Sequence, residues 1–119
     1  MADNISPPIS TEELQQLQDG ISASIQTVLK AYNACDDPVD CATLLNQSQQ
    51  LAGQMSRIET ALFHQQTIEA SAAISGAFDS ADGFIAELKQ MTKSLDQASK
   101  IITAAAKLAG VVAQILAVL

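Results

Sequence analysis

The stretch that decides the fold is the end of the chain, residues 84–119, FIAELKQMTKSLDQASKIITAAAKLAGVVAQILAVL. Its apolar residues recur at alternating steps of four and three, which is the 3.5-residue repeat of a left-handed coiled-coil seam. We therefore expect one long helix over residues 81–119, of which the part from residue 84 would measure about 54 Å. The seam positions are Phe84, Leu88, Met91, Leu95, Ala98, Ile102, Ala105, Ala109, Val112, Leu116 and Leu119.

The last part of this stretch is more apolar than a helix buried on one face requires. From Ile101 to Leu119, fifteen of nineteen residues are apolar. The four exceptions, Thr103, Lys107, Gly110 and Gln114, follow at steps of four, three and four and therefore form one narrow stripe. A single neighbouring helix cannot cover the rest of the helix circumference.

Three arrangements would remove this apolar surface from water. Two other helices of the same chain could enclose it and leave only the narrow stripe exposed. A partner protein or a second copy could cover part of it, since large apolar patches mark such contacts. Membrane insertion is the third arrangement, because nineteen helical residues just span a bilayer core of roughly 30 Å. The charge of Lys107 inside this segment makes insertion less favourable. The candidate partner-binding residues are Leu108, Val111, Val112, Ile115, Leu116 and Leu119.

Two further helices are predicted upstream. The first covers residues 11–35, because apolar residues recur every three or four positions after the capping box Ser10–Glu13. The second covers residues 38–75, with Asp37 as N-cap and Pro38 at the first helical position. The segment Gly76–Gly83, GAFDSADG, holds two glycines and several capping residues and is the predicted second turn, either a full reversal or a bend.

The fold class is therefore predicted to be all-α. We expect an antiparallel three-helix bundle, which can also be described as a long coiled-coil-like hairpin with an extra N-terminal helix. Only four aromatic residues, five glycines and three prolines argue against a β-sandwich or barrel. Residues 10–119 would form a single domain, and residues 1–9, which contain Pro7-Pro8, a flexible N-terminal arm.

The charge distribution limits the classes of partner and the compartment. The formal net charge is −7, and the first forty residues carry seven acidic residues against one basic residue. Nucleic acid is therefore not an expected partner, because phosphate binding needs clustered Lys and Arg. The N-terminus lacks the basic start and apolar core of a secretory signal, so we expect a cytoplasmic protein or one exported without a cleavable signal peptide.

The sequence contains no recognised catalytic or metal-binding motif. Cys35 and Cys41 flank the first predicted turn, where a local disulfide is sterically allowed, whereas a reducing compartment would leave two thiols. The only histidine, His64, is more than twenty residues away, so a zinc site is not expected. We expect no enzyme activity, no cofactor and no metal.

The leading functional hypothesis is a non-enzymatic helical interaction protein, such as an adaptor, a chaperone-like protein or an assembly subunit. It would bind a protein partner or itself through the apolar C-terminal helix. The alternative is a membrane-active helical protein, such as an exported toxin or pore component, that inserts this helix. An acidic chain with an Ala-, Ser- and Gln-rich body and an apolar C-terminal helix is a general pattern of secretion-associated and membrane-active helical proteins. No motif here names a family.

Overall fold

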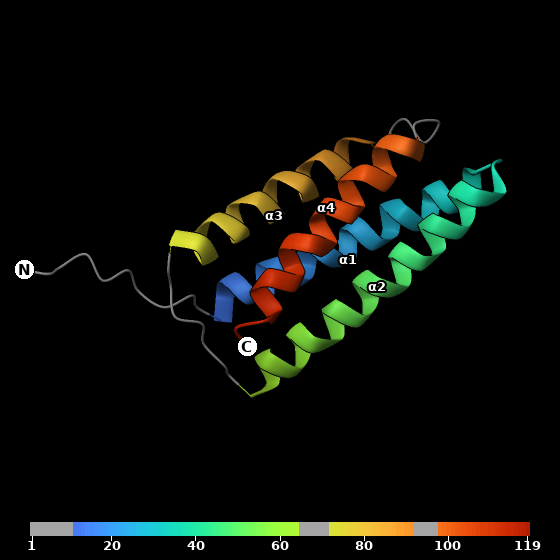
Figure 1. Cartoon of the computed structure of the whole chain (residues 1–119). Coiled ribbons are helices and arrows are strands. Elements are labelled where there is room, and N and C mark those ends of the chain that lie inside the picture. Colours follow the sequence, from blue (N-terminus) through green and yellow to red (C-terminus); the bar gives the residue numbers. More distant parts are fainter. Residues whose placement is uncertain (1–10, 65–71, 92–97) are drawn as a thin grey trace, which may run out of the picture.

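The computed structural model describes residues 11–64, 72–91 and 98–119. Within these ranges every regular element is an α-helix, which confirms the predicted all-α class (Figure 1). The helices are α1 (Thr11–Ala34), α2 (Pro38–Phe63), α3 (Ala72–Met91) and α4 (Ala98–Leu116).

The four helices form a bundle of two hairpins. Helix α1 packs along α2, and α3 packs along α4, with α1 and α3 beginning at one end of the molecule and α2 and α4 at the other (Figure 1). The helices within each hairpin are therefore antiparallel. The hairpins meet through the parallel pairs α1–α3 and α2–α4, and α1 also contacts α4 across the middle of the bundle.

The number of helices corrects the three-helix prediction. The predicted helix 81–119 is wrong, because α3 ends at Met91 and α4, which begins at Ala98, packs back along α3. Two segments that lie side by side cannot belong to one straight helix. The repeat hid the reversal, because antiparallel bundle helices on both sides of a connection show the same apolar spacing. The predicted seam position Leu95 lies outside the described residues.

The predicted turn at Gly76–Gly83 is also wrong, because both glycines lie inside α3. Each is exposed and has no neighbouring atom within 4 Å of the place a Cβ would occupy, so neither marks a tight approach or a reversal. The predicted helix 38–75 is divided: α2 ends at Phe63 and the last predicted residues belong to α3. Residues 65–71, the arm 1–9 and the Ser10 cap lie outside the described residues.

The start of α2 follows from local chemistry. Asp37 has extended backbone angles, and its carboxylate accepts a hydrogen bond of 2.9 Å from the Val39 backbone N–H. Pro38 occupies the first position of α2, where a backbone N–H would have no acceptor within the helix. The acidic Asp40 lies in the first turn, where its negative charge interacts favourably with the positive end of the helix dipole and stabilises α2.

All four helices contribute to one hydrophobic core. Helices α1 and α3 approach closely at Gly20, where an added Cβ would stand 2.5 Å from Cδ1 of Ile85. Gly20 therefore provides the space that the Ile85 side chain occupies. The largest fully buried side chains are Leu14, Leu17, Ile21, Leu44, Leu51, Ile58, Leu88, Ile101, Leu108, Ile115 and Leu116.

Two buried glutamines connect α2 to α4. The side-chain amide of Gln47 donates to the backbone carbonyl of Ile102 at 2.8 Å, and that of Gln54 donates to the carbonyl of Ala109 at 2.9 Å. Gln47 and Gln54 are seven residues apart in α2, and Ile102 and Ala109 are seven residues apart in α4, so the contact repeats after two helical turns. Both glutamines are 8% exposed, and the Oε1 atom of each is buried without a hydrogen-bond partner. A buried polar atom left unpaired costs about 1–3 kcal/mol.

We predict that Leu108→Ala lowers the free energy of unfolding by about 2–5 kcal/mol, because it removes a fully buried side chain from the centre of α4. Val118→Ala is the matched control. Because Val118 is 50% exposed, this substitution should lower the free energy of unfolding by less than about 1 kcal/mol. Urea denaturation followed by circular dichroism measures both. Equal costs for the two variants would contradict the placement of α4 in the core.

Candidate functional site: the α3–α4 groove

The predicted partner-binding residues do not form an exposed surface. Leu108, Val112 and Ile115 are fully buried, and Leu116 is 2% exposed. Val111 and Leu119 are half-buried and pack against the same core. The expectation that these residues contact an outside partner is corrected for the folded chain, because α1, α2 and α3 already cover them.

The exposed side of α4 includes the stripe that the sequence predicted to face water. Thr103, Lys107, Gly110 and Gln114 are all exposed. The exposed surface is wider than this stripe because it also includes small apolar residues, at positions 106 and 113. The outer side of α4 is therefore made largely of small and polar side chains.

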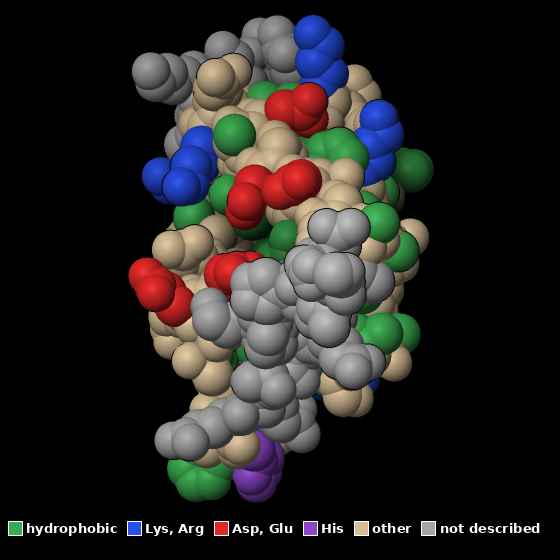
Figure 2. All heavy atoms as spheres, turned by 90° about the vertical axis from the view of Figure 1, so that its left-hand side faces the viewer, with side chains coloured by type: hydrophobic (Ala, Val, Ile, Leu, Met, Phe, Trp, Pro, Cys, Tyr) green, Lys and Arg blue, Asp and Glu red, His purple; other side chains and the backbone are tan. Residues whose placement is uncertain are grey.

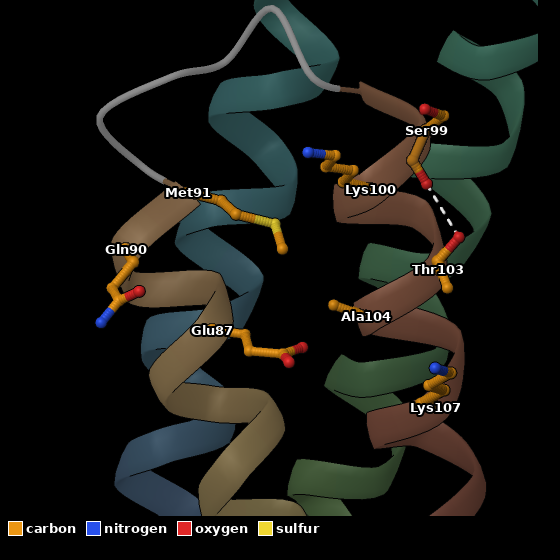
Figure 3. A pocket seen from close by; sticks show the side chains of 8 residues that line it. All are labelled: Glu87, Gln90, Met91, Ser99, Lys100, Thr103, Ala104 and Lys107. Carbon is orange, nitrogen blue, oxygen red and sulfur yellow. Dashed lines mark hydrogen bonds between the residues drawn. The ribbon is translucent and has the colours of Figure 1, made fainter.

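A groove of about 470 Å³ lies between α3 and α4. Its position beside the reversal places it toward the same end of the bundle as the α1–α2 turn (Figures 1 and 3). This volume is within the range of small-ligand pockets. The lining residues are Glu87, Gln90, Met91, Ser99, Lys100, Thr103, Ala104 and Lys107.

The groove combines an apolar floor with charged sides. Met91 of α3 points toward α4 and lies above the buried Ala104 (Figure 3). The carboxylate of Glu87 also points toward α4, and the ammonium group of Lys100 points back toward α3 (Figure 3). An apolar group could contact Met91 and Ala104 while polar groups beside it meet both signs of charge.

Lys107 and Thr103 already have contacts within the chain. The Lys107 Nζ atom lies 6.0 Å from the centre of the Phe84 ring, which is the outer limit of a cation–π contact between α4 and α3. The Thr103 hydroxyl donates to the Ser99 backbone carbonyl at 2.9 Å (Figure 3). Because Lys107 already contacts Phe84, Lys100 and Glu87 are the main charged groups that a ligand would meet among the described lining residues.

Sequence reasoning missed this groove because of the unrecognised reversal. In a continuous helix, Glu87 and Lys100 would lie thirteen residues apart, about 20 Å along the axis. In the hairpin they come from facing helices and line the same groove (Figure 3). Neither Gly nor Pro stands between them in the sequence to signal the reversal.

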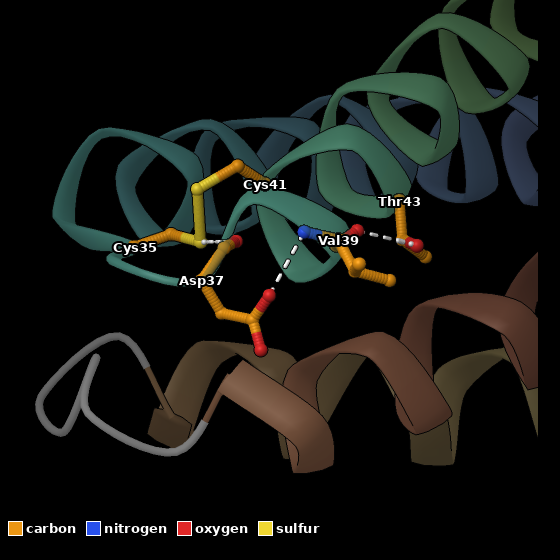
Figure 4. The surroundings of a disulfide bond; sticks show 5 residues. All are labelled: Cys35, Asp37, Val39, Cys41 and Thr43. Carbon is orange, nitrogen blue, oxygen red and sulfur yellow. Dashed lines mark hydrogen bonds between the residues drawn. A yellow bond between two sulfur atoms is a disulfide. The ribbon is translucent and has the colours of Figure 1, made fainter.

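Cys35 and Cys41 form a disulfide that closes the α1–α2 turn (Figure 4). Their Cα atoms are 5.7 Å apart, and both residues are half-exposed. The bond connects the end of α1 with the first turn of α2, beside the Asp37 cap (Figure 4). The first hairpin is therefore held covalently as well as by packing.

His64 is remote from both features. It caps α2, at the end of the bundle opposite the α1–α2 turn (Figure 2, purple), and its ring lies edge-on to that of Phe63, with 5.4 Å between the ring centres. Among residues 11–64, 72–91 and 98–119, no three His, Cys, Asp or Glu side chains are grouped so as to hold a metal ion.

Comparison of the chain with protein-family models, curated proteins and solved structures found no match.

We predict that replacing both cysteines by serine lowers the free energy of unfolding by about 2 kcal/mol, because the disulfide restricts a short loop in the unfolded chain. Denaturation of the oxidised protein and of the Cys35→Ser/Cys41→Ser variant measures the difference. A reducing agent should produce a similar loss in the unmodified protein and none in the variant. A stability that is insensitive to both changes would contradict the prediction.

Proposed function

We propose that this protein is a non-enzymatic binding module that holds a segment of a protein partner in the α3–α4 groove. The observation that carries the proposal is the groove itself, a hollow of about 470 Å³ with an apolar floor and charged sides. It replaces the buried face of α4 as the candidate contact. The C-terminal helix remains part of the interface, but through its exposed side.

The chemistry of the groove favours an amphipathic partner segment. One apolar side chain would rest on Met91 and Ala104, where it would lose contact with water. A neighbouring acidic group would meet Lys100 at the side of the groove. Glu87 would accept a hydrogen bond from a backbone N–H or a basic group of the same segment.

A binding role also agrees with the groups that line the groove. Acid–base catalysis commonly pairs a carboxylate with a second carboxylate or a histidine. Among the described residues that line the groove, Glu87 is the only acidic residue and none is a histidine. We therefore keep the absence of catalysis as part of the proposal.

We further propose that the protein acts in an oxidising compartment. Disulfides persist in secreted and periplasmic proteins and are rare where glutathione keeps thiols reduced. The Cys35–Cys41 disulfide is half-exposed and would be accessible to reductants. Of the two compartments expected from the sequence, the disulfide thus favours the exported form over the cytoplasmic one.

The groove can be tested by filling it. Thr103→Trp would place a large ring at the rim of the groove, and Ala113→Trp would place the same ring on an exposed part of α4 outside its lining. We expect Thr103→Trp to weaken partner binding at least tenfold and Ala113→Trp to change it less than twofold.

A photoreactive amino acid placed at position 103 or at position 113 would crosslink the partner in the native host. The captured partner is then titrated with the unmodified protein and with each tryptophan variant. Both variants should unfold at the same denaturant concentration as the unmodified protein. Equal crosslinking from the two positions, or equal affinity of the two tryptophan variants, would refute a site in the groove. Capture of a second copy of the chain would identify the partner as the protein itself.

A further inference from the structure

We infer that the α3–α4 hairpin separates from the disulfide-closed α1–α2 hairpin and lays its inner apolar face on an anionic lipid bilayer. This activity goes beyond the proposed groove function, because it uses the opposite side of the hairpin. Three observations carry it: the composition of α4, the polar atoms between the two hairpins, and the connections that hold each hairpin together.

Helix α4 has the composition of a helix that binds at a membrane surface. It has 19 residues, a mean hydropathy of 1.4, and is the one helix among the described residues that is long and apolar enough to cross a bilayer. It carries Lys100 and Lys107 but no acidic residue, in a chain with 13 acidic and 6 basic residues. The only charged side chains of α4, Lys100 and Lys107, lie on its exposed side among small and polar residues and opposite its apolar face, an arrangement that helices at the lipid headgroups also have.

The position of Lys107 favours lying on the bilayer over crossing it. Lys107 is in the middle of α4 and would stand in the hydrocarbon core if the helix crossed the membrane, which is unfavourable for an ammonium group. In a helix parallel to the surface, Lys100 and Lys107 would reach the phosphate groups instead. These two cations give α4 itself a preference for an anionic lipid surface over a neutral one, whereas α3 carries Asp79, Asp82 and Glu87 against Lys89.

The contact between the two hairpins contains polar atoms that opening would satisfy. The Oε1 atoms of Gln47 and Gln54 are buried between α2 and α4 without a hydrogen-bond partner. Water would bind both atoms as soon as α4 moved away from α2. These two unpaired atoms therefore lower the stability of the closed bundle relative to a bundle in which the same contact is purely apolar.

Each hairpin has its own internal connection. The Cys35–Cys41 disulfide holds α1 to α2, and the packing of α3 on α4 holds the second hairpin. Along the chain, only residues 64–71 join α2 to α3. Opening between the hairpins breaks no covalent bond and would expose Ile101, Leu108 and Ile115 of α4.

Vesicle binding of the oxidised full chain tests the inference. We expect co-sedimentation with vesicles that contain phosphatidylglycerol, and at least tenfold weaker binding to pure phosphatidylcholine vesicles. Lys100→Gln/Lys107→Gln should weaken binding to the anionic vesicles at least tenfold. Because both lysines are exposed, this variant keeps the core intact.

A second pair of variants tests the opening itself. Gln47→Met/Gln54→Met removes both unpaired oxygens together with the two hydrogen bonds to α4, and leaves an apolar contact of similar size. Because the backbone carbonyls of Ile102 and Ala109 are helical acceptors, we expect at least tenfold weaker vesicle binding and a higher unfolding midpoint. Gln50→Met is the control, because Gln50 is an exposed residue of α2 and its substitution should leave binding unchanged.

Absence of binding to anionic vesicles, equal binding to neutral vesicles, or unchanged binding of the double methionine variant each overturns the inference. Hydrogen exchange supplies the readout that does not depend on substitutions. With anionic vesicles, the backbone amides of α2 should lose protection along the side that faces α4. Unchanged protection, or a concentration-dependent dimer formed without lipid, would overturn the inference as well.

Discussion

The apolar surface of α4 has to be removed from water, and the rest of the bundle is arranged around this requirement. Eight residues of α4 are buried, and they face all three other helices. One antiparallel neighbour could not cover so wide a surface. The parallel contact with α2 and the diagonal contact with α1 complete the cover, which explains why the two hairpins pack together as a single bundle.

The sequence was sufficient for the class of fold and for the local structure that a few residues determine. Apolar spacing in α1, from Leu14 to Ala31, and the Asp37–Pro38 signal at the start of α2 act within one or two turns, so they can be read without tertiary information. The reversal between α3 and α4 could not be read in this way. Its segment carries no Gly or Pro, and the heptad spacing continues across it.

The candidate site was missed for the same reason. The groove is formed by side chains such as Glu87 and Lys100, which become neighbours only when α4 folds back on α3. Sequence reasoning recognised that the C-terminal helix carries an excess of apolar surface and left open whether helices of the same chain, a partner or a membrane covers it. The leading functional hypothesis used the second of these arrangements. The fourth helix changes that balance. The proximity of Cys35 and Cys41 was foreseen from the turn, whereas their pairing also depends on the compartment.

The two glutamines of α2 have a consequence for which substitutions the protein tolerates. Gln47 and Gln54 bind the backbone of α4 at Ile102 and Ala109, and no side chain of α4 takes part in these hydrogen bonds. Every residue type presents the same backbone carbonyl acceptor, and proline is excluded only because it would break the helix. Homologous chains could therefore vary the side chains of α4, as long as their sizes fit the core. The axial position and the rotation of α4 relative to α2 would stay the same. Changes at positions 47 and 54 would instead alter the alignment of the two helices.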